Sequence, residues 1–291
     1  MKKKVNNDSV IIETEHKEMN TKPIVIVCAG EGSLHERLFV RSEDKPYELM
    51  VIYYGNSDTV DNTFRDSADY YFREKGIKFN LIWKILEANP ELKERVKNAE
   101  YVQIMDDDML TDIANVTAAF QYCKQYDLAL AQPSLTEDSH IFWKVLKKGT
   151  NRNGPDIREI NSVELMMPIF SKQFFNLIYD WFEYFYTGYH MDTRLWAQLV
   201  LENNWKCAVI DRASYKHTRP MGKGDIYINS RGIINENQEI NIWKRVYNAD
   251  EKQLFYWFLS GTITPKFTAF QLAARKWKNN MYLTNLTKIN N

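Results

Sequence analysis

The sequence predicts an α/β protein whose central sheet is mostly parallel and covered by helices. Short apolar runs alternate with helical patterns along most of the chain, which is the order found in sheets built from strand–helix–strand units. Most runs are apolar throughout, which indicates strands buried on both faces. One run, residues 101–105, ends in the consecutive aspartates Asp106, Asp107 and Asp108. Ligands bind at the carboxyl ends of strands in such sheets, so we expect a functional site there.

The expected strands are short apolar runs, rich in β-branched residues, that end at glycine, proline or charged residues. In chain order they cover residues 24–29, 49–54, 101–105, 128–133, 163–167 and 208–210. The first runs into the glycine loop at Gly30, and the second ends at Gly55. Glu164 is a charge inside the fifth apolar run, which makes it a candidate for a functional role.

The expected helices have apolar residues spaced three and four apart, so that one face of each covers the sheet. A helix over 79–88 stops before Asn89-Pro90, because the residue before a proline avoids the helical conformation, and a second short helix begins there. Asp112 is placed to cap the helix that follows the aspartates. Two more helices are expected over 171–185 and 192–201.

Composition excludes several classes of protein. The 291 residues are 44% hydrophobic and 26% charged, as in an ordinary soluble protein. Lys+Arg and Asp+Glu both total 38, so the overall charge gives no reason to expect nucleic acid as a partner. No signal-peptide core and no apolar run of membrane-spanning length follows the N-terminus, which predicts a cytoplasmic protein. The well-separated cysteines Cys28, Cys123 and Cys207 are expected to be reduced core residues.

The chain divides into three parts. Residues 1–22 are polar and without pattern, which predicts a mobile tail; residues 23–234 form the α/β domain; residues 235–291 are a helical extension. The extension is basic and rich in aromatic residues. Such a segment is typical of a surface helix on an anionic membrane, here its inner face, and equally of a helix packed on the main domain or on a second subunit.

The aspartate triplet has two interpretations. Alternate residues of a strand share a face, so Asp106 and Asp108 point the same way. These carboxylates repel one another unless a cation is present, and Mg²⁺ or Mn²⁺ binds through one or two carboxylates together with substrate phosphates. A metal–phosphate site is therefore one hypothesis. The other is a solvated turn in which an aspartate only caps the next helix.

Four motifs in order carry a resemblance to a known family. They are the strand, acidic turn and helix around Asp106, the segment 163–171, Gly188-Tyr-His-Met-Asp192, and the segment 208–217. Over residues 79–224 the chain resembles a glycosyltransferase-like family of plants and bacteria, domain-of-unknown-function family 707. That family is in turn similar to nucleotide-sugar-dependent glycosyltransferases with the GT-A fold. The resemblance implies a single GT-A (Rossmann-like) domain.

The resemblance also implies roles for residues. In GT-A enzymes the acidic strand end holds Mn²⁺ or Mg²⁺ against the donor's diphosphate. Asp108 would then ligate the metal, Asp106 would reach the nucleotide ribose or metal-bound water, and Asp107 would support them. His217 matches the position of a further metal ligand. Asp192 matches the catalytic base, although it is also well placed as a helix N-cap, and Glu164 is the competing candidate, assigned here to the acceptor.

Basic residues are expected to meet the diphosphate, since arginine forms bidentate phosphate contacts and lysine provides a point charge. Each of these residue types is more often a surface residue than a ligand. The candidates are Lys84, Arg152, Arg158, Lys216 and Arg219.

The expected function is therefore metal-dependent transfer of a sugar from a nucleoside-diphosphate sugar to a hydroxyl of a glycan or lipid-linked acceptor, in surface polysaccharide synthesis. One alternative is a non-catalytic nucleotide- or sugar-binding module with the same fold. A sugar nucleotidylyltransferase is a weaker alternative, because its glycine-rich loop ends in an arginine, and here Arg37 comes too late after Gly30.

Overall fold

The structure is a computed structural model. It describes residues 21–38, 45–149, 154–185, 188, 190–220 and 263–265. The predicted N-terminal tail, Arg152 and nearly all of the predicted C-terminal extension lie outside the described residues, apart from residues 21, 22 and 263–265.

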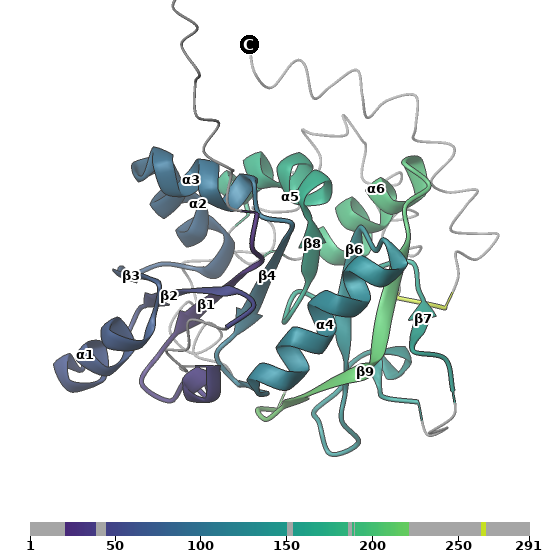
Figure 1. Ribbon diagram of the computed structural model, residues 1–291, viewed down its shortest axis with the longest axis horizontal. Helices are drawn as coiled ribbons and strands as arrows, with labels where there is room; N and C mark the ends of the chain where they lie inside the picture. Colours follow the sequence, from purple (N-terminus) through teal and green to yellow (C-terminus); the bar gives the residue numbers. More distant parts are fainter. Residues whose placement is uncertain are drawn as a thin grey trace, which may run out of the picture.

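One twisted sheet dominates the fold (Figure 1). In the order of their hydrogen-bonded neighbours its strands run β3-β2-β1-β4-β8-β6-β9-β5, with β7 also paired to β9. The strands are β1 (Ile24–Ala29), β2 (Glu48–Tyr53), β3 (Tyr70–Arg73), β4 (Tyr101–Asp106), β5 (Met109–Leu110), β6 (Leu130–Leu135), β7 (Ile157–Glu159), β8 (Ile169–Ser171) and β9 (Cys207–His217).

The sheet has a parallel half and a mixed half. Strands β3, β2, β1 and β4 are parallel to one another, and of these the sequence predicts β1, β2 and β4 but not β3. Strand β8 then runs antiparallel to both β4 and β6, while β6 and β9 are parallel. The short strands β5 and β7 are antiparallel to β9. The fold is an α/β sheet of the predicted class, with an antiparallel strand inserted at its centre.

Helices cover the sheet, and one group lies along one end of it (Figure 1). Helix α4 packs across β9 and β6, whereas α2, α3 and α5 lie together beside β4 and β8. The helices are α1 (Asp58–Ser67), α2 (Lys78–Ala88), α3 (Pro90–Lys97), α4 (Ile113–Tyr126), α5 (Lys172–Ile178) and α6 (Ala197–Glu202). The predicted N-cap at Asp112 is confirmed, since its side chain accepts a hydrogen bond from the amide of Asn115 at 2.8 Å.

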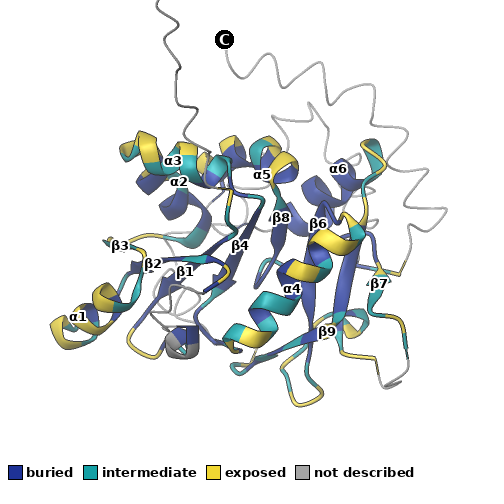
Figure 2. Cartoon of the chain, in the orientation of Figure 1, coloured by how far each residue is buried: buried dark blue, intermediate teal, exposed yellow. Residues whose placement is uncertain are grey.

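The central strands form the core, as Figure 2 shows in dark blue. Every residue of β1 and of β6 is buried. Strand β1 is apolar throughout, as expected where both faces of the sheet are covered, whereas β6 also buries the polar residues Gln132 and Ser134. The cysteines Cys28, Cys123 and Cys207 are buried and unbridged, as predicted. Burial raises the pKa of the Cys28 thiol to about 12, so this thiol stays protonated at neutral pH.

The predicted strand over 163–167 is wrong. This segment is irregular and contains a turn, and the strand begins only at Ile169. The carbonyls of Met166 and Pro168 still accept hydrogen bonds from β4, but on the other side the amide of Glu164 is bound by the side chain of Gln132 instead of a neighbouring strand. A side-chain amide thus replaces a backbone partner, and the ladder cannot form there.

Two predicted helices also differ in detail. Helix α5 ends at Ile178 and continues as a 3₁₀ turn over Tyr179–Glu183. The predicted helix over 192–201 begins as a π-helix, Met191–Trp196, before α6. Its N-cap is His190, so the predicted N-cap role of Asp192 is wrong. The final strand is longer than the predicted 208–210, because it continues to His217 and carries that residue to the acidic turn.

The three described residues of the C-terminal part lie against the main domain. Ile263 is buried in the hydrophobic core, and the backbone of Thr264 is bound by Asn161. The Thr264 amide donates to the Asn161 side-chain oxygen at 2.8 Å, and the Asn161 amide donates to the Thr264 carbonyl at 3.1 Å. Across the described parts of the chain, no helix is long and apolar enough to cross a membrane.

Candidate active site

The three aspartates lie where β4 ends, and the antiparallel pairing of β5 with the end of β9 brings His217 beside them. In this pairing Met109 lies opposite His217, which places the imidazole beside Asp108. Nε2 of His217 lies 3.4 Å from Oδ2 of Asp108, and Nδ1 lies 2.8 Å from the carbonyl oxygen of His140. Burial lowers the pKa of His217, but hydrogen bonds with Asp108 and His140 outweigh it, and the pKa is raised overall.

Asp107 is held in a cradle of donors. It accepts hydrogen bonds from the Tyr54 hydroxyl at 2.6 Å and from the Gly30 amide at 2.9 Å, and Arg219 lies 3.5 Å away. A side chain at residue 30 would lie 2.8 Å from the Tyr54 hydroxyl oxygen, so only glycine fits. Asp107 therefore ties the loops after β1 and β2 to the end of β4.

Asp106 is paired with Lys78, which is not among the predicted basic residues. Nζ of Lys78, the first residue of α2, donates to Oδ1 of Asp106 at 2.5 Å and to the carbonyl of Leu165 at 2.6 Å. Burial raises the pKa of Asp106 to about 6; Lys78 opposes this shift and the charge of Asp108 adds to it.

Asp108 is the member of the triplet best placed to bind a cation. Its side chain is buried, and its Oδ1 atom has no hydrogen-bond partner among the described residues. A buried carboxylate oxygen without a partner is costly unless a ligand satisfies it. As placed, the described residues contain no group of three or more His, Cys, Asp or Glu side chains that could hold a metal ion. The Asp108–His217 pair nevertheless fits a Mn²⁺ or Mg²⁺ site in which substrate phosphates and water complete the shell.

Glu164 is a buried carboxyl group that interacts electrostatically with Asp106 of the triplet. Its amide donates to Oε1 of Gln132 at 2.7 Å, and its Oε2 atom has no partner in the described part of the chain. Burial raises its pKa to about 8, with Asp192 and Asp106 adding to the shift and His217 opposing it. These electrostatic interactions place Glu164 among the other candidate residues, and its acid form dominates at neutral pH.

Asp192 lies within the π-helical turn and is also buried. Its Oδ1 atom accepts a hydrogen bond from the Thr193 amide at 2.6 Å, and its carbonyl accepts one from the Ser162 hydroxyl at 2.5 Å. Burial raises the pKa of Asp192 to about 6, although the Thr193 amide and Arg194 favour the carboxylate. With these pKa values, Asp192 is mainly ionised at neutral pH, whereas Glu164 is mainly protonated.

The turn before Asp192 requires its glycine. Gly188 has a φ of 75° and His190 a φ of 67°, so the backbone is left-handed at both positions. A Cβ atom at residue 188 would also lie 2.9 Å from the ring of Phe79. The left-handed backbone at Gly188 and His190 therefore sets the path of the chain into the π-helical turn and with it the position of Asp192.

Most of the predicted basic residues that the structure describes do not contact the aspartate triplet, and Arg219 is the exception. Arg219 reaches Asp107, but Arg158 forms an ion pair with Asp211 at 2.6 Å and Lys216 one with Asp138 at 2.5 Å. Lys84 is exposed on α2. The lysine of this helix that contacts the acidic turn is Lys78, its first residue, which pairs with Asp106. The signal for Lys78 was its position two residues after Gly76, where a helix begins at the carboxyl edge of the sheet.

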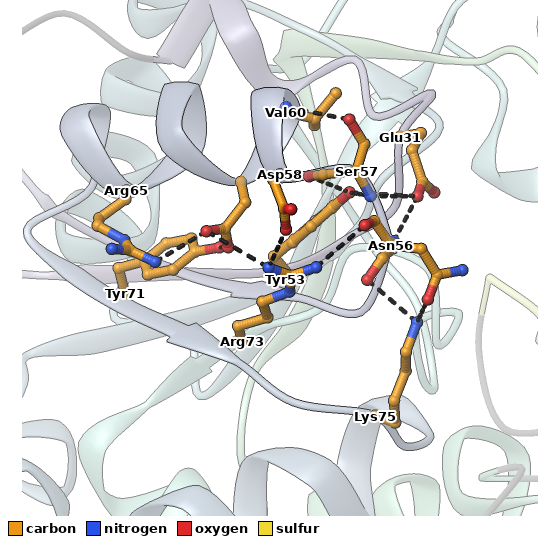
Figure 3. Close-up of polar contacts among 12 residues, drawn as sticks. Glu31, Tyr53, Asn56, Ser57, Asp58, Val60, Arg65, Tyr71, Arg73 and Lys75 are labelled. Carbon is orange, nitrogen blue, oxygen red and sulfur yellow. Dashed lines mark hydrogen bonds and ion pairs between the residues drawn. The ribbon is translucent and has the colours of Figure 1, made fainter.

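A second polar network surrounds the loop after β2, as Figure 3 shows. The exposed Glu31 accepts hydrogen bonds from the amides of Asn56 at 2.5 Å and Ser57 at 3.2 Å. The backbone hydrogen bond from Asn56 is the main reason why the pKa of Glu31 is lowered to about 2. Lys75 donates to the Gly55 carbonyl at 3.1 Å and to the Asn56 side chain at 2.9 Å. This network holds the loop that presents Tyr54 to Asp107.

The raised pKa of Glu164 predicts a pH-dependent stability. Its folded-state pKa of about 8 lies above the ordinary value of 4.5 expected in the unfolded chain. The stability associated with the protonated carboxyl group is therefore complete below about pH 4.5, falls as the pH rises, and is lost once the pH passes 8. Because glutamine does not titrate, we expect the stability of Glu164→Gln relative to the wild type to rise by about 4 kcal/mol between pH 5 and pH 8.5. Urea unfolding at the two pH values measures this difference.

The matched control for this experiment is Glu137→Gln, because Glu137 is exposed and paired with Lys147 at 2.7 Å. Its pKa is lowered by that contact, so its effect on stability is the same at pH 5 and pH 8.5. A difference between Glu164→Gln and the wild type that did not change with pH would show that Glu164 is not held in its acid form.

The sheet and the acidic turn define a GT-A-like fold. A solved structure of GalNAc-T7 with UDP, GalNAc and Mn²⁺ matches it with a TM-score of 0.52 and 9% sequence identity. The match covers 92% of this chain and 57% of that one, so the chain spans little more than half the length of this neighbour. No family model and no curated protein matches the sequence. The expected membership of domain-of-unknown-function family 707 is therefore not confirmed, whereas the GT-A-like fold is.

Proposed function

We propose that this protein is a metal-dependent glycosyltransferase that moves a sugar from a nucleoside-diphosphate sugar to an acceptor hydroxyl. The observation that carries the proposal is the Asp108–His217 pair, a carboxylate and an imidazole 3.4 Å apart with one buried carboxylate oxygen left without a partner among the described residues. In a GT-A-like fold this pair lies at the carboxyl edge of the sheet, where ligands bind. The UDP and Mn²⁺ in the GalNAc-T7 structure support the same assignment by analogy.

On the donor side, Asp108 and His217 would hold Mn²⁺ or Mg²⁺. The cation supplies charge neutralisation for the departing diphosphate, usually the largest contribution to this kind of transfer. Asp107 stays in its cradle of Tyr54 and Gly30 and keeps the acidic turn in place. Arg219, beside Asp107, is the predicted arginine best placed to contact a phosphate.

On the acceptor side, the two buried carboxyl groups take different roles because their pKa values differ. Asp192, with a pKa of about 6, is ionised at neutral pH and removes the proton from the acceptor hydroxyl as its oxygen attacks the sugar. Glu164, with a pKa of about 8, keeps its proton and donates a hydrogen bond to the acceptor. A base on the acceptor makes the transfer an inverting one. The acceptor is a glycan or lipid-linked hydroxyl, reached at the inner face of a membrane.

The test is a screen of UDP-, GDP-, CDP- and TDP-sugars with Mn²⁺, reading release of the nucleoside diphosphate with and without simple glycoside acceptors. We expect one nucleotide class to be turned over, with acceptor-dependent release at least about ten-fold above hydrolysis. Nucleotide binding without turnover on any acceptor would instead indicate a non-catalytic module. Pyrophosphate release from a nucleoside triphosphate and a sugar 1-phosphate would indicate a nucleotidylyltransferase.

A further inference from the structure

Lys78 pairs with Asp106, the carboxylate next to Asp108 at the proposed metal site. Its ammonium group donates to Asp106 at 2.5 Å and to the Leu165 carbonyl at 2.6 Å, and its side chain is only 15% exposed. The same ammonium lies 4.9 Å from the centre of the Phe79 ring, an attractive cation–π arrangement. These contacts place the positive charge of Lys78 at the end of β4.

We infer that Lys78 is an internal cation that competes with the divalent metal ion for Asp106 and thereby sets the metal affinity of the site. The inference rests on the proposed function, in that a metal ion binds beside Asp106. In the metal-free protein the lysine neutralises Asp106, whereas Asp108 Oδ1 has no partner among the described residues. A cation can therefore bind this oxygen of Asp108, whereas the charge of the neighbouring Asp106 is already neutralised by Lys78.

The charges around the turn support competition. Asp106 is the last residue of β4 and Asp108 lies in the turn directly after it, and the charge of Asp108 helps to raise the pKa of Asp106. Two carboxylates that repel each other bind a dication tightly only if both remain negative. A lysine bound to one of them lowers the negative potential felt at the other, so it weakens metal binding even if it never moves.

Removing this positive charge should strengthen metal binding. We expect Lys78→Met to bind Mn²⁺ alone about ten-fold more tightly than the wild type, since a like charge within contact distance of the ligands is lost. Lys78→Arg keeps the charge and should stay within about three-fold of the wild type. Titration calorimetry at neutral pH, with Mn²⁺ and no nucleotide, measures each affinity.

The matched control is Lys124→Met. Lys124 also pairs with a carboxylate, Glu100 at 2.9 Å, but its side chain is 71% exposed and the pair lies at the opposite end of β4. We expect its Mn²⁺ affinity to equal that of the wild type within about two-fold, because exposed charges far from a site are screened. If Lys78→Met does not fold, Lys78→Gln replaces it: the amide can still donate to Asp106 and Leu165, but carries no charge.

Unchanged or weaker Mn²⁺ binding in Lys78→Met or Lys78→Gln, including no binding by any variant, would overturn the inference and make Lys78 a purely structural partner of Asp106. Tighter binding in the neutral variants alone supports it. The comparison uses no nucleotide, so it is separate from the proposed function, which fails if the wild type binds no nucleoside diphosphate in Mn²⁺.

Discussion

Asp192→Asn is expected to lower kcat about 10³-fold while leaving donor binding within about two-fold, because general-base catalysis contributes 10²–10⁴-fold in rate. The substitution is nearly isosteric. Asparagine keeps an oxygen that can accept the hydrogen bond from the Thr193 amide, so the π-helical turn keeps its local partner. What is lost is the carboxylate that would accept the acceptor's proton. Initial rates at saturating donor and acceptor, together with donor affinity by calorimetry, measure the two quantities separately.

The control for Asp192→Asn is Asp180→Asn, the same substitution at an exposed residue of the 3₁₀ turn after α5, which should leave kcat unchanged. The pH dependence of the wild type distinguishes the two carboxyl groups. Asp192 as base predicts a rise in kcat/KM around its pKa of about 6, and Glu164 as base a rise around 8. Full activity in Asp192→Asn would mean that Asp192 only shapes the turn, as a retaining mechanism would allow.

Asp108→Asn is expected to weaken Mn²⁺-dependent nucleotide binding about 100-fold, because it removes the charge of the carboxylate assigned to the metal. The fold should survive the change. Asp108 is buried, and one of its oxygens lacks a partner among the described residues, so a neutral amide costs less to bury. Thermal unfolding should therefore show an unchanged or higher Tm, while calorimetry with Mn²⁺ and nucleotide shows the loss.

Asp112→Asn is the matched control, since it makes the same change four residues further on. Asp112 caps α4 through the Asn115 amide, and asparagine is an equally good cap. Its nucleotide binding should equal that of the wild type. An Asp108→Asn variant that bound nucleotide as tightly as the wild type would remove the metal role from Asp108 and leave the acidic turn as a structural feature.

The parallel strands and the acidic turn could be predicted from the sequence because their signals are local. A fully apolar run such as 24–29 can only be buried, and Asp112 sits directly before an amphipathic run. Strand β8 could not be predicted in this way. Its two neighbours, β4 and β6, are chosen by packing over long sequence separations, and the apolar segment before it is kept out of the sheet by the Gln132 side chain.

The candidate site was predicted in part. Asp106, Asp107, Asp108 and His217 come together, and the interactions that shift the pKa of Glu164 place it near Asp192. The roles of the basic residues were harder to predict, because the partner of a charged side chain is often distant in sequence. Arg158 is bound by Asp211, 53 residues away, and Lys78 by Asp106, 28 residues away. Long cationic side chains near a predicted site are therefore weak indicators of ligand contact.

The most direct test of the central claim is calorimetric binding of UDP, GDP, CDP and TDP to the wild-type protein, first with Mn²⁺ and then with EDTA. A metal-dependent nucleotide site at the end of β4 predicts that one of these nucleotides binds in Mn²⁺ and loses that binding in EDTA. Absence of binding under both conditions, or binding that EDTA does not change, would contradict a metal-dependent nucleotide-sugar transferase.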